Sequence, residues 1–368
     1  MKILFVMPAH ISYGGIESTA LNMWRGLTKR GHHIDFVCHG SQKGIFENEI
    51  KTTGSRVFHI PLKSQNFRKM KAVFRYILKT GSYEAVHAHM NATSGIYLQM
   101  AKEYGVPVLA AHSHASSMRV VTGNPFKAVI NHFEKYRTNQ LANVKIACSD
   151  KAGRWLYGRN PHTVIFNAVD VNLYSYSPYI REMKRKSLGI TQDEWVGIHV
   201  GSFTKNKNQS FLIQVLHELE NRKIKMHLLM AGKGPTFHKI SHLIQKNGLE
   251  SRITLLGERN DINELLQAAD VFFLPSVSEG NPVSLMEAAA SGLHCLVSET
   301  VSNSLAPYFE PGMIEYLPIK LENAALIWAK SAIKPYKRVE FTRDSQFVFT
   351  IEHMSKQIED LYLAVFNN

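Results

Sequence analysis

The sequence has no long apolar run and few cysteines. Its first apolar segment, Ile3–Met7, is five residues long and stops at Pro8, whereas a membrane span needs roughly 18 apolar residues. The segment therefore predicts a buried first strand rather than a signal peptide. The three cysteines, Cys38, Cys148 and Cys295, are widely separated and form no Cys-x-x-Cys pair, which predicts free thiols in a reducing compartment. We expect a cytoplasmic protein that is at most peripheral on the inner face of the cell membrane.

Acidic residues are scarce in the first half of the chain. Residues 1–165 carry 22 lysines and arginines against 8 aspartates and glutamates, whereas residues 166–368 carry 21 against 22. The net charge of +13 therefore comes wholly from the first half. Such an excess attracts anionic lipid, an acidic substrate or nucleic acid, or else simply keeps the surface soluble. The sequence shows no nucleic-acid recognition module and no platform of stacking aromatics, so no nucleic acid partner is expected.

Apolar runs typical of strands alternate with helical patterns, and the whole series occurs twice. The predicted strands are 3–7, 34–38, 56–60, 85–88, 108–111 and 145–148 in the first half, and 196–200, 227–231, 252–255, 271–274 and 294–297 in the second. This alternation predicts an α/β protein with two Rossmann-like domains, each built on a parallel sheet, and a join near 167–179. Ligands of such sheets bind at the carboxyl ends of the strands, so the residues that follow each strand are the candidates for a site.

The segment Ser276–Ala288 is the strongest candidate. It follows the strand 271–274 and leads into a predicted helix, whose first turn suits Pro282. Glu279 then lies in the loop and Glu287 about one turn into the helix. Unpaired N–H groups at a helix start can hold phosphate, and the Glu287 carboxylate can accept hydrogen bonds from a ribose diol. The alternative is an ordinary capped helix with two solvated carboxylates.

This segment resembles the E-x7-E motif of the retaining family-4 glycosyltransferases, enzymes with the GT-B fold. Four other segments resemble motifs of the same family: the amino-terminal glycine loop at Gly14–Glu17, a signature at Cys148–Gly158, the interdomain linker at Val164–Asp170 and a glycine-rich turn at Leu228–Pro235. Together these matches cover nearly the whole chain. The signature at Cys148–Gly158 is similar to that of the branch that builds bacterial capsule and exopolysaccharide.

The resemblance implies two Rossmann-like domains whose parallel sheets face each other across a cleft. Residues 1–167 would form the acceptor-binding domain and 168–347 the nucleotide-sugar-binding domain, with a C-terminal helix of about 348–368 able to pack back on the first. The implied activity is transfer of a hexosyl group from a nucleotide sugar, with UDP as the expected nucleotide, to a lipid-linked glycan or polysaccharide, with retention of configuration and without a cofactor. A sugar-nucleotide epimerase of the same fold remains the alternative.

The family motifs also imply roles for single residues. Glu279 would lie near the donor sugar, and His114, or else His112, would contact that sugar. The residues expected to bind the donor and its nucleotide are Gly15, Gly201, Lys207, Gly232, Gly280, Asn281, Pro282, Val283 and Glu287. Lys207 corresponds to the lysine that neutralises the donor diphosphate. Ser202 stands where the family has arginine and cannot offer phosphate a bidentate charged contact.

Two patterns bear on metal binding. No two aspartates are spaced Asp-x-Asp, the pair with which metal-dependent glycosyltransferases of the other main fold hold a divalent ion. Histidines follow two predicted strands, at His87, His89, His112 and His114, and alternate residues of a strand share a face. Four imidazoles can bind zinc, but no carboxylate or cysteine is spaced to complete such a site. We therefore expect no metal, with positive side chains and helix N-termini neutralising the diphosphate instead.

The predicted helix within 63–83 combines an apolar stripe with basic flanks. Its apolar side chains recur at helical spacing, at Phe67, Met70, Phe74, Ile77 and Leu78, and its basic flank comprises Arg68, Lys69, Lys71 and Arg75. The stripe is typical of an amphipathic helix packed on a sheet. The flank suits anionic lipid headgroups, so we expect these four basic side chains to form a membrane or acceptor surface.

Overall fold

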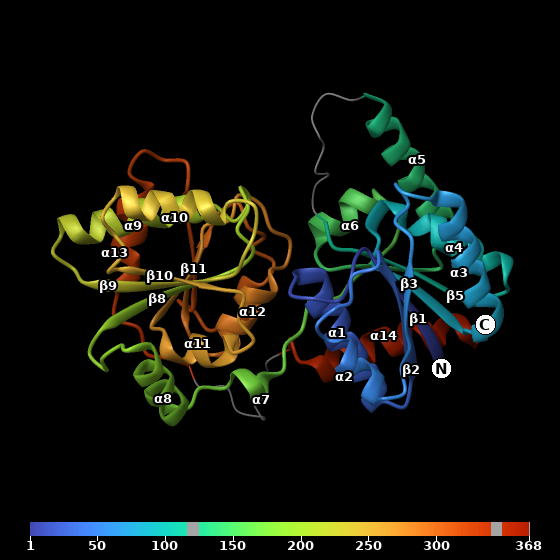
Figure 1. Cartoon of the computed structure of the whole chain (residues 1–368), viewed down its shortest axis with the longest axis horizontal. Helices are drawn as coiled ribbons and strands as arrows, with labels where there is room; N and C mark the ends of the chain where they lie inside the picture. Colours follow the sequence, from blue (N-terminus) through green and yellow to red (C-terminus); the bar gives the residue numbers. More distant parts are fainter. Residues whose placement is uncertain (116–124, 340–347, 368) are drawn as a thin grey trace. The chain divides into compact units, whose positions relative to one another are not determined.

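The structure, a computed structural model, describes residues 1–115, 125–339 and 348–367. Contacts within the chain divide it into two compact units. One comprises Met1–Ala168 together with Ile351–Asn368, and the other comprises Val169–Thr350. In each unit a twisted sheet carries helices on both of its faces (Figure 1).

The first unit is built on a parallel sheet in the strand order β3-β2-β1-β4-β5-β6-β7. Its strands are β1 (Lys2–Met7), β2 (His33–His39), β3 (Val57–Ile60), β4 (Ala85–Ala88), β5 (Val108–Ser113), β6 (Val144–Ala147) and β7 (Thr163–Val164). Its helices are α1 (Gly15–Lys29), α2 (Glu47–Thr52), α3 (Phe67–Gly81), η1 (Asn91–Thr93), α4 (Ser94–Glu103), α5 (Pro125–Leu141), α6 (Asp150–Tyr157) and α14 (Ile351–Phe366). The strand order reverses between β1 and β4, which is where a sheet of this kind binds ligands.

The core of the first unit lies on both faces of β1, whose residues 3–7 are fully buried. Alternate side chains of a strand point to opposite faces. Leu4 belongs to the cluster that includes Phe74 of α3, while Phe5 belongs to the cluster that includes Trp24 of α1 and Ile358 of α14. The helix α14 therefore completes the core of the first unit, although the chain reaches it only after passing through the second unit.

The second unit has a parallel sheet in the order β10-β9-β8-β11-β12-β13. Its strands are β8 (Trp195–Val200), β9 (Met226–Ala231), β10 (Ile253–Gly257), β11 (Val271–Leu274), β12 (His294–Ser298) and β13 (Ile314–Leu317). Its helices are α7 (Val171–Tyr174), α8 (Pro178–Leu188), α9 (Gln209–Asn221), α10 (Phe237–Lys246), α11 (Ile262–Ala268), α12 (Val283–Ala290), η2 (Ala306–Tyr308) and α13 (Ala324–Ala332). Here the order reverses between β8 and β11, so the residues after these two strands mark the expected ligand site.

The predicted fold class is confirmed, since both units are Rossmann-like and every strand pairing within the two sheets is parallel. The sequence reasoning missed β7 and β13, which lie at the edges of their sheets. An edge strand is covered less completely than a central one, and most residues of these two strands are only partly buried. Their sequences consequently lack the continuous apolar run by which the central strands are recognised.

Candidate active site

Glycines bring the ends of β8 and β9 close together. Gly232 has a φ of +134°, and a Cβ added there would lie 2.1 Å from the carbonyl oxygen of Gly201. Only glycine fits such a position, because any side chain would collide with backbone. A Cβ added at Gly201 would lie 3.2 Å from Cε of Lys207. The Lys207 side chain therefore lies against Gly201, at the carboxyl end of β8.

Lys207 and Glu279 link the loops that follow β8 and β11. The Lys207 ammonium lies 3.0 Å from Glu279 Oε1, and Asn206 donates a hydrogen bond of 3.1 Å to the same oxygen. Asn206 also donates to the carbonyl of Ser278. These contacts place a cation and a carboxylate side by side at the switch point of the sheet. A diphosphate would compete for the lysine, and the carboxylate could then accept a hydrogen bond from a sugar hydroxyl.

The loop after β11 leads into α12. Gly280 and Asn281 are buried there. Pro282 occupies the N-cap position with φ −73° and ψ 121°, so it precedes the helix and does not lie in its first turn as predicted. The reason is that extended backbone at Pro282 turns the chain from the loop into the helix. The helix itself begins at Val283, whose N–H belongs to the first turn and lacks a helical acceptor.

Glu287 lies one turn into α12. Its Oε1 accepts a hydrogen bond of 2.8 Å from the hydroxyl of Tyr174, a residue of α7. Burial raises the pKa of the Glu287 carboxyl, while the Tyr174 hydrogen bond and the charge of Lys207 oppose that rise. The sequence reasoning missed both Tyr174 and Asn206. Tyr174 belongs to the tyrosine-rich stretch after the predicted linker, and Asn206 directly precedes the predicted phosphate lysine.

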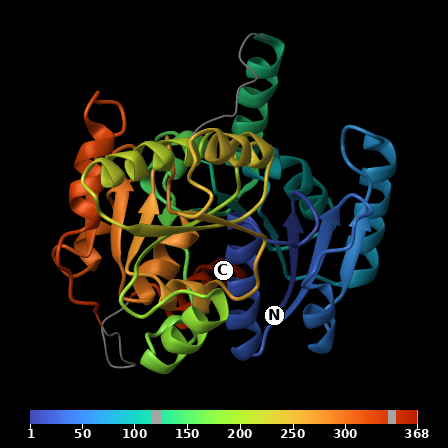
Figure 2. The ribbon, with the colours of Figure 1, turned by 60° about the vertical axis from the view of Figure 1, so that its left-hand side comes forward.

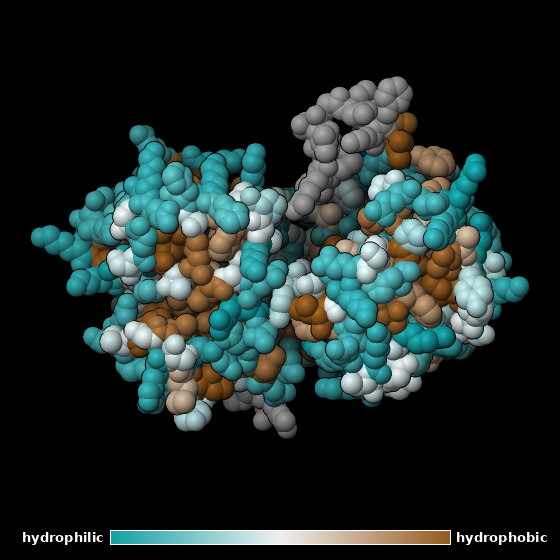
Figure 3. All heavy atoms as spheres, viewed as in Figure 1, coloured by the Kyte–Doolittle hydropathy of each residue, from teal (hydrophilic) through white to brown (hydrophobic). Residues whose placement is uncertain are grey.

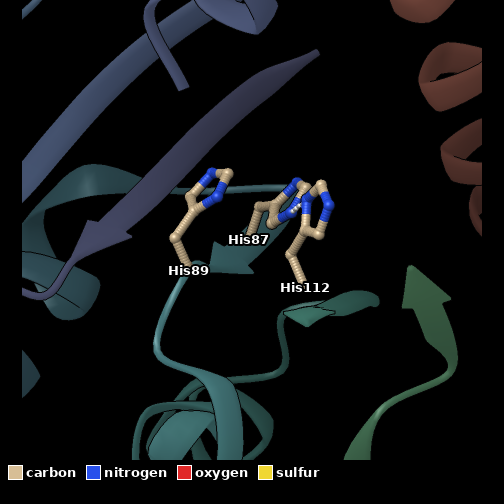
Figure 4. Close-up of side chains that lie close together, drawn as sticks. All are labelled: His87, His89 and His112. Atoms are coloured by element: carbon tan, nitrogen blue, oxygen red, sulfur yellow. Dashed lines mark hydrogen bonds between the residues drawn. The ribbon is translucent and has the colours of Figure 1, made fainter. Parts of the chain in front are cut away.

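The four histidines singled out in the sequence form two hydrogen-bonded pairs. His89 and His114 directly follow β4 and β5 as predicted, whereas His87 and His112 lie inside these strands, which position them within the sheet. The nitrogens His87 Nε2 and His112 Nδ1 lie 3.3 Å apart, and His89 Nδ1 and His114 Nε2 lie 2.9 Å apart. On its other side His87 Nδ1 meets the hydroxyl of Tyr362 at 2.5 Å. Figure 4 shows His87, His89 and His112, with the bond between His87 and His112 drawn as a dashed line.

Burial controls the charge of these histidines. It lowers the pKa of His87 and of His114 to about 3, and it lowers those of His89 and His112 well below the ordinary value. All four imidazoles are therefore neutral at pH 7, when one ring nitrogen of each carries a proton and the other accepts.

The cluster offers the nitrogen ligands of a possible metal site. Nitrogens of His87, His89 and His112 lie within 4.8 Å of one another. The pair His87 Nε2 and His112 Nδ1 is 3.3 Å apart, close to the roughly 3.4 Å between ligands of a tetrahedral zinc at about 2.0–2.1 Å. Among the residues that the structure describes, the group consists of histidines alone. In this structure Nε2 of His87, Nδ1 of His89 and Nδ1 of His112 are each engaged in a hydrogen bond with another ring of the cluster. The donor set therefore favours a hydrogen-bonded network.

Two further positions singled out in the sequence, Gly15 and Ser202, lie at the surface, as does Lys205 near Ser202. Gly15 is the exposed first residue of α1, and an added Cβ there would meet nothing within 4 Å. Ser202 and Lys205 follow β8 and are both exposed. A longer side chain at position 202 would therefore have room, and Lys205 makes no ion pair with the carboxylates of the described residues.

The helix α3 packs as an ordinary amphipathic helix. Its apolar residues Met70, Phe74, Ile77 and Leu78 are buried in the core, while Phe67 is exposed. Among its basic side chains, Arg68 and Lys69 are exposed. Lys71 lies 4.9 Å from the ring centre of Phe67, and Arg75 pairs with Glu103 at 2.8 Å. Half of the predicted basic surface therefore also makes contacts within the unit. In the described part of the chain, no helix is long and apolar enough to cross a membrane.

The helix α5 carries an exposed apolar face that the sequence reasoning missed. Val129, Ile130, Phe133 and Tyr136 are 57–68% exposed, and apolar side chains are visible along this helix in Figure 3. Both ribbon views show the end of α5 extending away from the first unit (Figures 1 and 2). The opposite face holds the helix in place through buried Thr138, which accepts from the N–H of Gly95 and donates to the carbonyl of Ala92.

The sequence matches two family models, described as "Glycosyltransferase Family 4" over residues 13–173 and "Glycosyl transferases group 1" over residues 180–306. It is 30% identical over 339 residues to the putative glycosyltransferase EpsF of Bacillus subtilis (strain 168), a match that covers 90% of this chain and 86% of EpsF. It is 23% identical over 381 residues to the capsular polysaccharide biosynthesis glycosyltransferase CapH of Staphylococcus aureus, covering 99% of each chain.

The fold is also similar to that of solved structures. The crystal structure of Anabaena Alr3699/HepE in complex with UDP-glucose matches with a TM-score of 0.72 and 21% sequence identity, over 100% of this chain and 95% of that chain. The predicted resemblance to glycosyltransferases of capsule and exopolysaccharide synthesis is thus confirmed by the relatives. The chain belongs to the family-4 glycosyltransferases of the GT-B fold.

Proposed function

We propose that this glycosyltransferase moves a sugar from a UDP-sugar to a lipid-linked glycan or polysaccharide, with retention of configuration and without a metal. The observation that carries the proposal is the Lys207–Glu279 pair at the switch point of the second sheet. It joins a cation suited to the diphosphate with a carboxylate suited to a sugar hydroxyl. The similarity to HepE, whose crystal structure contains UDP-glucose, supports the choice of donor.

The donor would be held by groups of the second unit. Glu287, oriented by Tyr174, would accept hydrogen bonds from the ribose hydroxyls. Lys207 and the first N–H groups of α12 would stabilise the charge that grows on the diphosphate as the glycosidic bond breaks. Glu279 would orient a sugar hydroxyl rather than attack the anomeric carbon, and the leaving diphosphate would accept the proton of the acceptor hydroxyl.

The first unit would serve the acceptor and the donor sugar. We assign His114, with His112 as the second choice, to a hydrogen bond with the donor sugar, and Gly15 to the loop near the donor phosphate. Residues 1–167 would bind the acceptor and residues 168–347 the nucleotide sugar. The similarity to CapH, a glycosyltransferase of capsular polysaccharide biosynthesis, supports a glycan acceptor.

An anionic membrane surface is the proposed partner of the first unit. The excess of basic residues in the first half supports it, as do exposed Arg68 and Lys69 on α3. The apolar face of α5 adds side chains able to enter the interfacial region of a bilayer. This surface would keep a cytoplasmic enzyme beside a lipid-linked acceptor.

Product analysis tests the proposal against epimerisation. We would incubate the protein with UDP-sugars, with and without a bacterial lipid extract, and measure free UDP and the donor sugar. UDP release that requires the extract supports transfer, whereas conversion of the UDP-sugar without an acceptor supports an epimerase. A Glu287→Ala variant provides the control for contaminating activity.

A further inference from the structure

His114 is held from two sides by the segment that follows β4. His89, directly after β4, contacts the imidazole of His114 through Nδ1 and Nε2 at 2.9 Å. Asn91, at the start of η1, accepts hydrogen bonds through Oδ1 from the N–H groups of His114 at 2.8 Å and Ala115 at 3.1 Å. The strands β4 and β5 are parallel neighbours, so both segments emerge at the same edge of the sheet.

The position of the His89 ring is closely defined. The residue is fully buried, its ring stacks on that of His87 with centres 4.4 Å apart, and it meets the edge of Phe5 at 5.1 Å. Its second nitrogen, Nε2, is buried and has no hydrogen-bond partner among the residues that the structure describes. The ring therefore has a single polar contact in the described structure, and that contact is with His114.

This arrangement favours one tautomer of each ring. A buried N–H without an acceptor is rarer in proteins than a buried acceptor without a donor, so the proton of His89 belongs on Nδ1, where it can be donated. His114 Nε2 then accepts the hydrogen bond from His89 through its lone pair. A neutral imidazole has one protonated nitrogen, so the proton of His114 lies on Nδ1. Burial keeps both pKa values far below 7, which ensures that the neutral forms are present.

Asn91 fixes the backbone of the same residue. Its φ of +52° is in the left-handed region, which asparagine tolerates better than most residues because its side chain bonds to nearby backbone. Here the side chain binds two successive N–H groups after β5. The ring of His114 and its backbone are thus held by different residues of one short segment, His89–Asn91.

We propose that His89 and Asn91 are positioning residues that hold His114 with Nδ1–H as a hydrogen-bond donor to the donor sugar. The inference rests on the proposed function, in which His114 contacts that sugar. It adds a direction to the bond: the enzyme donates and a sugar oxygen accepts. Neither residue was singled out for this role by the sequence motifs, in which His89 counted only as one of four histidines.

The tautomer is tested directly on the full chain. Two-bond proton–nitrogen NMR spectra of protein labelled with ¹⁵N-histidine identify the protonated nitrogen of each ring, and His114→Gln assigns the signals of His114. We expect a proton on Nδ1 of His114 in the wild type, mixed tautomers in His89→Phe, and the wild-type tautomer in His89→Asn, whose amide nitrogen can replace Nδ1. Tyr362→Phe, which breaks a bond of the other histidine pair, should leave His114 unchanged. A proton on Nε2 of His114 in the wild type would overturn the proposal.

Enzyme kinetics test whether the positioning of His114 by His89 and Asn91 affects turnover. Small displacements of a positioning group lower turnover by one to two orders of magnitude. We expect His89→Phe and Asn91→Gly to reduce kcat about 10- to 100-fold with the KM for the donor within about threefold, and His89→Asn and Asn91→Asp to recover most of the rate. Asn91→Gly is the sharper variant, since glycine adopts a positive φ without strain and only the side-chain contacts are lost.

Two kinetic outcomes separate the inference from the proposed function. If His114→Ala retains full activity, His114 does not have the assigned role. The proposal that His89 and Asn91 position it for catalysis is then wrong as well. If His114→Ala is inactive while folded His89→Phe and Asn91→Gly both turn over normally, the function stands and the positioning proposal alone is wrong. Circular dichroism and the melting temperature of each variant establish that it is folded.

Discussion

The hydroxyl of Tyr174 donates a hydrogen bond of 2.8 Å to Glu287, across 113 positions of the sequence. The tyrosine belongs to the four-residue helix α7 and the glutamate to α12. This bond orients the carboxylate that we assign to the nucleotide ribose, and it identifies a residue that no motif named. It also provides a way to change the properties of Glu287 without removing the carboxylate.

Replacing Glu287 should weaken nucleotide binding. Hydrogen bonds to a charged group contribute about 1.5–3 kcal/mol, so Glu287→Ala should raise the Kd for UDP at least about tenfold. Tyr174→Phe should have a smaller effect in the same direction, because it keeps the carboxylate and loses only its orientation. Calorimetric titration with UDP measures both. An unchanged affinity in Glu287→Ala would refute the assignment.

UDP affinity should depend on pH through Glu287. Burial raises the pKa of this carboxyl above its ordinary value of 4.5, so it takes up a proton at a higher pH than an exposed glutamate. The protonated acid accepts ribose hydrogen bonds less well than the carboxylate. Affinity should therefore fall as the pH falls through the raised pKa. The phosphates of UDP titrate too, so the wild type is compared with Glu287→Gln between pH 8 and pH 5; equal pH dependence in the two proteins would contradict the prediction.

Restoring the arginine of the family at position 202 should tighten UDP binding. Ser202 is exposed, so a longer side chain has room, and a guanidinium can contact phosphate through two N–H groups. We expect Ser202→Arg to lower the Kd for UDP about three- to tenfold, the range of one to two charge-assisted contacts partly screened by solvent. Ser202→Gln, similar in length but uncharged, is the matched control. Weaker binding by the arginine variant would mean that Lys205 or another group already fills this role.

Vesicle binding should combine charge and apolar contact. Each basic residue near an anionic surface contributes about 1 kcal/mol, and salt screens the attraction within a Debye length. We expect sedimentation with anionic vesicles at low salt and release at high salt, with weaker binding in Arg68→Glu and Lys69→Glu. Replacing Phe133 on α5 by serine should weaken the binding that remains at high salt. Equal binding to neutral and anionic vesicles would refute the electrostatic part.

Gly232 should be required for stability as well as for the site. An alanine there would need a φ of +134° and would bring its Cβ to 2.1 Å from a backbone oxygen, so Gly232→Ala should lower the free energy of unfolding by about 1–3 kcal/mol or more. Gly15→Ala, which meets no atom within 4 Å, is the control and should change stability by less than about 1 kcal/mol. Urea unfolding followed by circular dichroism compares them.

The sequence predicted the elements whose signal is local. Central strands such as β1 and β11 are continuous apolar runs. The segment that contains Glu279 and Glu287 is recognisable because the two glutamates lie at a fixed spacing within one short stretch of sequence. The contacts of Tyr174 and Tyr362 could not be predicted, because their partners lie 113 and 275 positions away. No periodic pattern reports a contact between segments so distant.

The apolar face of α5 was missed for a different reason. Val129, Ile130, Phe133 and Tyr136 follow helical spacing, which ordinarily marks the side that packs on the core. In this helix the buried side contains polar residues instead, Glu134 and Thr138. Their partners lie elsewhere in the unit, Lys63 in the loop between β3 and α3 and Gly95 on α4. The pattern therefore shows that the helix is amphipathic without showing which side meets the protein.

The return of α14 to the first unit has a consequence for synthesis. The second unit is continuous in sequence from Val169 to Thr350, whereas the first is split by it. A ribosome makes the chain from its amino terminus, so the second unit can complete its core while the first still lacks Met354, Ile358 and Tyr362, which are buried in it. Until these last side chains arrive, the apolar surface of α1 and the imidazole of His87 stay uncovered. The first unit therefore completes its core only after the second unit has been made. During this interval its apolar surface is open to aggregation, until α14 covers it.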